Sequence, residues 1–236
     1  MIEKEPLINI LVRTSGRPQY FKKCIESIKL QRFKNYKIYI SYDNKEDLAY
    51  IKKSTDEHDI IIFCKKHNQN KNLNFPYNLY FNNLYNQISI GWILFLDDDN
   101  KLINNNSLLK ISNQLYDMHS LVIWKVKLLD KIIPLNSFQD KPKLYDIDSA
   151  NFAYNSIHKE KYGLWDGNKC ADFRVIKSLY TNLPKTIWID EVLVESQRTN
   201  IYGGKGIKDD LNHKYPLYKK IFFQIKIIIW KIIKRK

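Results

Sequence analysis

The sequence predicts an α/β fold in which a mostly parallel, Rossmann-type sheet is flanked by helices. Through the first hundred residues, short apolar runs of strand length alternate with segments whose apolar residues recur at helical spacing. This alternation is typical of βαβ units, which build parallel sheets. The chain has 236 residues and a hydrophobic content of 44%, enough to bury a substantial core.

The first helix is the most clearly marked element. Pro18 opens it, and Phe21, Cys24, Ile25 and Ile28 then fall on one face. The remaining elements of this half are expected at residues 7–13, 37–43, 59–65 and 92–96 for strands, and at 47–53 and 75–88 for helices.

The second half has a more mixed pattern. A loop-rich section at 136–168 interrupts the periodic segments. Helices are expected at 107–115 and 170–180, a strand pair within 120–135 and a strand at 186–196. We therefore expect one domain over residues 1–213, with a nucleotide-type half at 1–100 and a mixed half at 101–213, followed by a tail at 214–236.

The tail carries much of the net charge of +14, because it contains eight Lys and Arg residues and no acidic residue. If it is helical, it has a broad apolar face, made by Ile221, Phe222, Ile225, Ile228, Ile229 and Ile232. A basic amphipathic helix of this kind predicts binding to an anionic membrane surface, and the alternative is docking on the protein's own core. Three widely spaced cysteines favour a reducing compartment, so we expect a cytoplasmic protein peripherally associated with a membrane.

Three adjacent carboxylates, Asp97, Asp98 and Asp99, directly follow the apolar strand at 92–96. Ligands of open parallel sheets bind beyond the carboxyl ends of the strands. Three neighbouring carboxylates repel one another, and Mg²⁺ or Mn²⁺ shared with substrate phosphates would offset that repulsion. In an extended chain Asp97 and Asp99 share one side and Asp98 lies opposite. The alternative is a solvated acidic turn.

Two other strand ends carry polar groups. Arg13, Thr14 and Arg17 lie in or beside the turn TSGRP after the first strand, where cations and backbone amides can meet an anion. Asp43 lies at the tip of the second strand, where a simple turn role is the alternative. Three strand ends therefore offer polar groups to one crevice.

The order VRTSGRP, YISYDN, NFPYNLYFNNL and GWILFLDDDN resembles that of the family 2 glycosyltransferases, which have the GT-A fold. The resemblance implies that Thr14 and Asp43 contact the nucleobase, Asp97 the ribose, and Asp99 a metal ion. It also places Asn78 on the nucleotide side, although an exposed helical Asn is the alternative. Arg13, Arg17 and Asp98 complete the predicted nucleotide-sugar site, and Asp97 is a second metal-ligand candidate.

In the second half, CADFRVIKSL resembles the segment that carries the general base of this family, which makes Asp172 the base candidate. A helix N-terminal Asp favoured by the macrodipole is the alternative. Asp166, beside Trp165, is the reserve candidate. In the late segment GGKGIKDDLNH, the resemblance suggests Lys205 for the diphosphate and His213 for the metal, with a surface His as the alternative.

The resemblance thus implies a metal-dependent, inverting glycosyltransferase that uses a nucleotide-diphosphate sugar and either a glycan or a lipid-linked acceptor, in surface glycan or polysaccharide synthesis. A nucleotidyltransferase ranks lower, because TSGRP lacks the glycine-rich loop with lysine expected there. A nucleic-acid binder is suggested by the pI of about 9.5. The basic charge is instead concentrated in an apolar tail, so no nucleic-acid partner is expected.

Overall fold

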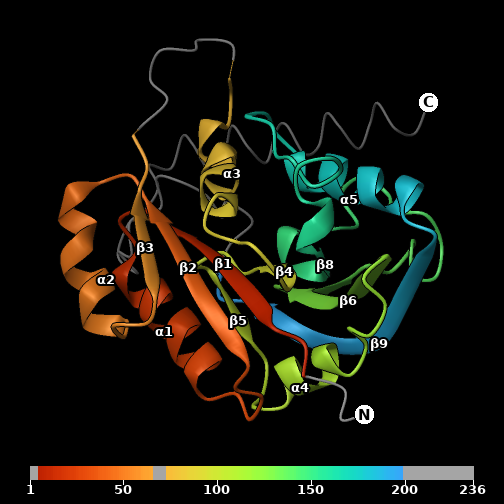
Figure 1. The fold of residues 1–236 in the computed structure, drawn as a ribbon, viewed down its shortest axis with the longest axis horizontal. Coiled ribbons are helices and arrows are strands. Elements are labelled where there is room, and N and C mark those ends of the chain that lie inside the picture. The colour runs from red at the N-terminus through yellow and green to blue at the C-terminus, as the bar shows by residue number, and fades with distance from the viewer. Residues whose placement is uncertain (1–4, 66–72, 199–236) are drawn as a thin grey trace.

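The computed structural model describes residues 5–65 and 73–198, and the strands in this part form one nine-stranded sheet (Figure 1). The strand order is β3-β2-β1-β4-β8-β6-β9-β5, with β7 paired to β6. Within the same residues, no helix combines the length and apolarity that crossing a membrane requires. Lys205, His213 and the predicted tail helix lie outside the described residues.

The first four strands run parallel, as the sequence predicts. They are β1 (Ile8–Thr14), β2 (Tyr36–Tyr42), β3 (Ile60–Phe63) and β4 (Trp92–Phe95). Thr14 at the end of β1 lies opposite Tyr42 of β2. The amide of Asp98 continues the ladder between β1 and β4 by donating to the carbonyl of Arg13 at 3.3 Å. The predicted polar strand ends therefore meet at one edge.

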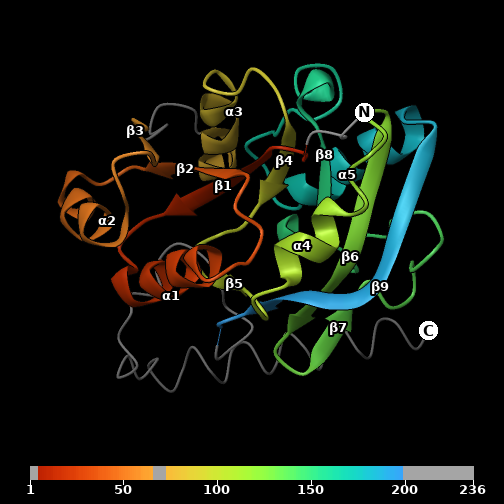
Figure 2. The same cartoon turned by 60° about the horizontal axis from the view of Figure 1, so that its bottom comes forward.

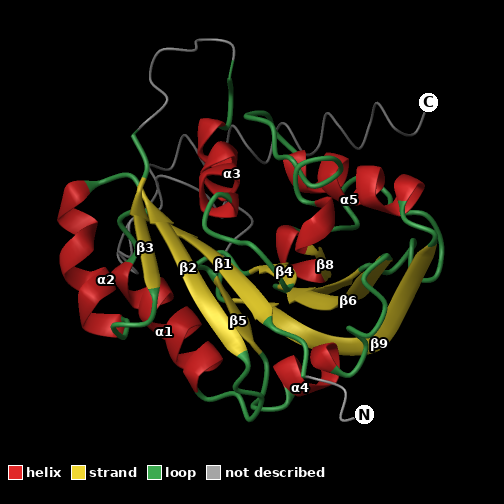
Figure 3. Cartoon of the chain, viewed as in Figure 1, coloured by secondary structure: helices red, strands yellow, loops and turns green. Residues whose placement is uncertain are grey.

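The other strands are mixed in direction (Figure 3). The strand β8 (Phe152–Asn155) runs antiparallel between β4 and β6 (Ser120–Leu128), and β7 (Lys131–Ile133) forms a hairpin with β6. The long β9 (Lys185–Ser196) runs parallel to β6, and its end pairs antiparallel with β5 (Asn100–Leu102). The sequence prediction missed β8 and β5, because strands of four and three residues are too short to show a period.

Helices cover both faces of the sheet (Figure 2). The helices α1 and α4 pack on one face and α3 and α5 on the other. The predicted helix at 75–88 is instead a 3₁₀ turn, Pro76–Leu79, followed by the short α3. The helix bounds are α1 Pro18–Lys29, α2 Leu48–Ser54, α3 Tyr80–Tyr85, α4 Ser107–Ser112 and α5 Ala171–Asn182.

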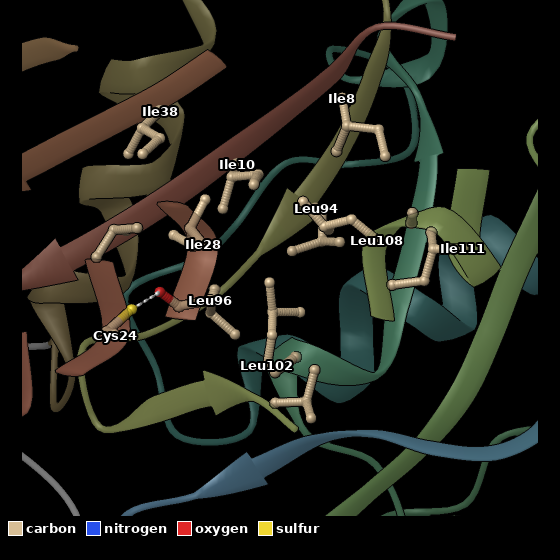
Figure 4. Close-up of a cluster of buried hydrophobic side chains, with 14 of the residues drawn as sticks. Ile8, Ile10, Cys24, Ile28, Ile38, Leu94, Leu96, Leu102, Leu108 and Ile111 are labelled. Atoms are coloured by element: carbon tan, nitrogen blue, oxygen red, sulfur yellow. Dashed lines mark hydrogen bonds between the residues drawn. The ribbon is translucent and has the colours of Figure 1, made fainter. Parts of the chain in front are cut away.

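Alternate side chains of the central strands fill two separate hydrophobic clusters. In β1, Ile10 and Val12 belong to the cluster under α1, whereas Leu11 belongs to the cluster under α3 and α5. Figure 4 shows the first cluster, in which Leu94 and Leu96 lie near side chains of α1 and α4. Both leucines are fully buried. The residue immediately before the acidic run is therefore fixed by the core, and this fixes where the run begins.

Gly91, just before β4, is expected to tolerate no side chain. Its φ is +100°, and an added Cβ would lie 2.7 Å from the carbonyl oxygen of Leu7 and 2.9 Å from Nδ2 of Asn9. Gly91→Ala should therefore lower the free energy of unfolding by about 1–3 kcal/mol, measured by urea denaturation. Gly16→Ala is the matched control, because its φ is +65° but nothing lies within 4 Å of the added atom. Equal losses in the two variants would contradict the steric argument.

Candidate functional site

A pocket of about 470 Å³ opens at the carboxyl ends of β1 and β4 and is bordered by the start of α5. It draws residues from both halves of the chain, so the two predicted halves contribute to one site. Its aromatic lining includes Phe75, Tyr77, Tyr80, Tyr145 and Trp165. Its charged lining consists of Arg13, Arg17, Asp97, Asp99, Asp148, Lys169, Asp172 and Arg198.

Asp97 is held by a bidentate pair with Arg13. Nε and Nη2 of Arg13 donate to the two carboxylate oxygens at 2.7 Å each, and Ser149 donates to one of them at 3.2 Å. Nη1 of Arg13 donates to Oδ1 of Asn78 at 2.8 Å. The guanidinium also lies over the ring of Phe81, 4.1 Å from its centroid. Such a clamp fixes Arg13 and leaves little freedom to Asp97.

Asp98 is fully buried and does not line the pocket. Arg17 donates to both of its carboxylate oxygens, and the Thr14 hydroxyl donates to one of them at 2.8 Å. Its side chain therefore lies on the opposite side from Asp97 and Asp99, as the strand alternation predicts. In this position Asp98 organises Thr14 and Arg17 from beneath the pocket.

Asp99 pairs with two arginines. Arg17 donates to Oδ2 from Nη1 at 3.0 Å, and Arg198 donates to the same oxygen from Nε at 2.7 Å. Asp99 itself is only 1% exposed, yet it forms part of the pocket wall. Its carboxylate is therefore enclosed by cationic donors.

Arg198 is a site residue that the sequence analysis missed. The pairing of β9 with β5 brings it there, because Ser196 lies opposite Asn100, the residue after the acidic run. The amide of Gln197 then donates to the carbonyl of Asp99 at 2.7 Å. Asp99 and Arg198 are 99 positions apart in the sequence, so no local signal indicates this contact.

Pairing with Arg17 and Arg198 explains how adjacent carboxylates of the acidic run can be buried together. Burial alone would raise the pKa of Asp99, but the charges of Arg198 and Arg17 lower it below its usual value. For Asp98, burial raises the pKa, and Arg17 opposes that effect. In this structure, arginines offset the repulsion between the three carboxylates, a role that the sequence analysis assigned to a divalent cation.

The resemblance of the motifs to family 2 glycosyltransferases implies a divalent metal ion at the acidic run. A metal site needs several oxygen donors free to converge on one point. Both Asp97 and Asp99 already accept from arginines, and residues 5–65 and 73–198 contain no cluster of three or more His, Cys, Asp or Glu that could hold a metal. In this part of the chain, neither of the two acidic-run carboxylates that line the pocket is free to ligate a divalent cation, because each is paired with arginine.

Asp172 lies in the first turn of α5 and lines the pocket. Burial raises the pKa of Asp172 to about 6, and the nearby charge of Asp148 acts in the same direction. The residue before the helix, Cys170, has a left-handed φ of +61°, an uncommon conformation for a residue with a side chain, and it also lines the pocket. A half-buried carboxylate with a raised pKa suits proton transfer.

Asp148 is a second carboxylate that the sequence analysis did not single out for the site. It caps the 3₁₀ turn Ser149–Asn151 by accepting from the amide of Ala150 at 3.1 Å. Burial raises the pKa of Asp148 too. Its sequence signal was that of an ordinary turn residue, because only the tertiary fold brings it to the pocket.

The reserve base candidate, Asp166, lies elsewhere. It pairs with Arg174 through both nitrogens of a fork and does not line the pocket, whereas the neighbouring Trp165 does. The hydrogen bond from Arg174 lowers the pKa of Asp166. A carboxylate held in this way is poorly suited to accept a proton, so the geometry favours Asp172.

The residues predicted to contact the nucleobase lie in the pocket wall or directly behind it. Thr14 lines it directly, whereas Asp43 is buried behind Ser15 and Tyr80, which donate to its two oxygens at 2.8 and 2.9 Å and line the pocket themselves. Asn78 is buried in the 3₁₀ turn, so the alternative of an exposed helical Asn is wrong.

No protein-family model and no curated protein matches this sequence. Solved structures do match the fold. S. aureus TarS 1–349 in complex with UDP-GlcNAc matches with a TM-score of 0.65 and 15% identity, covering 82% of this chain and 59% of that one. The mannosyltransferase PcManGT from Pyrobaculum calidifontis, in complex with GDP-Man and Mn²⁺, matches with a TM-score of 0.62 and 10% identity, covering 85% and 59%.

The chain has the fold of these glycosyltransferases. The α/β fold that the sequence predicts, with helices flanking the sheet, is thereby confirmed. This chain spans less than two thirds of the length of each matched structure, and at such low identity the likeness shows the fold alone.

Proposed function

We propose that this protein is a glycosyltransferase that moves a sugar from a nucleotide-diphosphate donor to an acceptor hydroxyl. The observation that carries the proposal is the position of Asp172, a half-buried carboxylate in the same pocket as Asp97 and Asp99. The pocket lies at the carboxyl ends of parallel strands, where open α/β sheets bind ligands. Matched structures of this fold were solved with UDP-GlcNAc and GDP-Man.

The donor is proposed to lie along the end of the pocket built by β1 and the acidic run. Thr14, Ser15 and Tyr80 line the part suited to the nucleoside, with Asp43 behind them. Asp97, held by Arg13, offers a fixed acceptor for a ribose hydroxyl. Arg17 and Arg198 then face the diphosphate.

The acceptor is proposed to enter beside Asp172, and the reaction to invert the anomeric centre. Asp172 takes the proton of the acceptor hydroxyl as that oxygen forms a bond to the anomeric carbon. The bond from the anomeric carbon to the diphosphate oxygen breaks, and the nucleoside diphosphate leaves with the electron pair. The proposed reaction is one direct displacement, so the configuration at the anomeric carbon is inverted.

The pH dependence should report Asp172. Its pKa of about 6 is set by burial and by Asp148, with Arg13 and Asp97 as the other charged groups that influence it. The basic form is required, so kcat/KM should rise about tenfold per pH unit below pH 6 and level off above it. A rate profile over pH 4.5–8.5, with protein stability checked at each pH, measures this. A flat profile through pH 6 would contradict the assignment.

The wider setting extends the proposal. It includes a hexosyl donor and a glycan or lipid-linked acceptor, which follow from the family resemblance. The basic amphipathic segment 214–236 supports a location on the cytoplasmic surface of a membrane. Lys205 belongs to the proposed diphosphate contacts.

Deleting the chain from residue 215 should abolish binding to anionic liposomes while preserving nucleotide binding, because the described residues proposed to bind the nucleotide-sugar donor all precede that segment.

The proposal is tested by incubating the full chain with a panel of UDP- and GDP-sugars and measuring the products. Slow release of the nucleoside diphosphate from one donor, accelerated by a saccharide acceptor, is the expected result. Release of pyrophosphate from a nucleoside triphosphate would instead identify a nucleotidyltransferase. Mn²⁺ and EDTA are included as separate arms, because the family resemblance implies a metal, whereas both acidic-run carboxylates that line the pocket are paired with arginine.

A further inference from the structure

We propose that the donor diphosphate is held by the guanidinium groups of Arg198 and Arg17 in the position where a divalent cation would be expected. The inference rests on the proposed function and deepens it, since it assigns the charge that stabilises the leaving group. Its starting point is the contact between Arg198 and Asp99.

The carboxylate of Asp99 is the acid of the run best placed to bind a cation, because Asp98 does not line the pocket and Asp97 is locked to Arg13. Arg198 covers it. Nε of Arg198 lies 2.7 Å from Oδ2 of Asp99, and Nη2 lies 3.4 Å from Oδ1. Nη1 of Arg17 lies 3.0 Å from the same Oδ2. A cation at Asp99 would lie against two guanidinium groups and would be repelled by both.

The same two arginines are suited to a diphosphate. Guanidinium presents five N–H donors in a planar fork that matches phosphate oxygens, and it stays charged at every working pH. Within the described residues, Arg198 bonds to Asp99 through Nε and Nη2. Its side chain is 27% exposed, against 14% for Arg13 and 12% for Arg17. Arg198 therefore has the most room to turn toward a ligand in the pocket.

Asp99 then has a different role from that of a metal ligand. It positions Arg198 over the pocket and accepts from Arg17 at the same time. Lys169, which also lines the pocket and is exposed, adds a further cation. The stabilisation of the departing diphosphate would come from these fixed side-chain charges.

The test measures binding of UDP and GDP to the full chain by calorimetry, with EDTA and with excess Mn²⁺, and Mn²⁺ binding by electron paramagnetic resonance. One nucleotide should bind in EDTA with a Kd within about threefold of its value in Mn²⁺. Arg198→Met should weaken that binding by about 10- to 100-fold in EDTA. Arg32→Met is the matched control, because Arg32 is exposed and does not line the pocket.

Asp99→Asn distinguishes a metal-ligand role of Asp99 from a role in positioning Arg198, because the two roles predict opposite effects on nucleotide binding. If Asp99 only positions Arg198, the variant should keep nucleotide binding within about threefold or improve it. Asn retains an oxygen that can accept from Arg198, and a negative charge near the diphosphate is removed. Loss of binding in Asp99→Asn together with stoichiometric Mn²⁺ binding would overturn the inference. These arms do not depend on how well Arg198→Met folds.

Failure of the inference and failure of the proposed function give different results. Nucleotide binding that requires Mn²⁺ would overturn the arginine assignment and leave the glycosyltransferase proposal standing. Absence of UDP and GDP binding under every condition, in a wild-type chain shown to be folded by circular dichroism, would overturn both. The supporting result is metal-independent binding that weakens by about 10-fold or more in Arg198→Met and is kept in Asp99→Asn and Arg32→Met.

Discussion

Asp172→Asn is expected to lower kcat by about 10²- to 10⁴-fold while leaving nucleotide binding within about threefold of wild type. Asn has nearly the same shape as Asp and cannot take the acceptor proton. Burial raises the pKa of Asp172 to about 6, which makes it a better proton acceptor than an exposed carboxylate would be. Steady-state transfer rates and calorimetric titration of the nucleoside diphosphate measure the two effects separately.

Asp166→Asn is the competing variant for the same role. Because Arg174 lowers the pKa of Asp166 and Asp166 does not line the pocket, its change should alter kcat by less than about threefold. The opposite pattern, a large loss in Asp166→Asn and little in Asp172→Asn, would move the base to Asp166. The pH profile gives a further check, since the rise near pH 6 should disappear in Asp172→Asn.

The parallel half of the fold could be predicted because its signals are local. The apolar face of α1, Phe21, Cys24, Ile25 and Ile28, is buried as its spacing predicts. The acidic run follows an apolar segment, so a strand with a polar end is readable from ten consecutive residues. A parallel sheet then places that end beside the ends of β1 and β2, and this step needs no knowledge of side-chain contacts.

The second half of the site depends on pairings that no local pattern carries. Arg198 reaches Asp99 only because β9 pairs with β5, a strand of three residues. Asp148 reaches the pocket because β8 inserts antiparallel between β4 and β6. The charges of the acidic run indicated that positive charge was needed at this site, but not which groups supply it. From them the sequence analysis predicted a divalent cation at this place, whereas in the structure the positive charge comes from arginine side chains.

Arg17→Met is expected to lower the free energy of unfolding by about 3–5 kcal/mol, the cost of leaving a buried charge without its partner. Asp98 is fully buried, and Arg17 donates to both of its oxygens and to one of Asp99. Urea denaturation at pH 7.5 measures the loss. Arg32→Met, on the surface, should stay within about 0.5 kcal/mol of wild type.

The loss in Arg17→Met should also depend on pH, with a sign that follows from Asp98. Burial raises the pKa of Asp98, and without Arg17 nothing of comparable charge opposes that rise. A carboxyl whose folded-state pKa is raised binds more protons in the folded state, so stability falls as pH increases above its unfolded pKa of about 3.9. The variant should therefore be closer to wild type at pH 5 than at pH 8.

The double variant Arg17→Met/Asp98→Asn separates the missing charge partner from lost packing. Removing the carboxylate along with the arginine takes away the uncompensated charge, so the double variant should be more stable than Arg17→Met alone and should lose its pH dependence. Asn retains an oxygen that can accept from the Thr14 hydroxyl, as Asp98 does at 2.8 Å. If the double variant is no more stable than Arg17→Met, then Arg17 acts through packing, and the pairing with Asp98 is not what stabilises the acidic run.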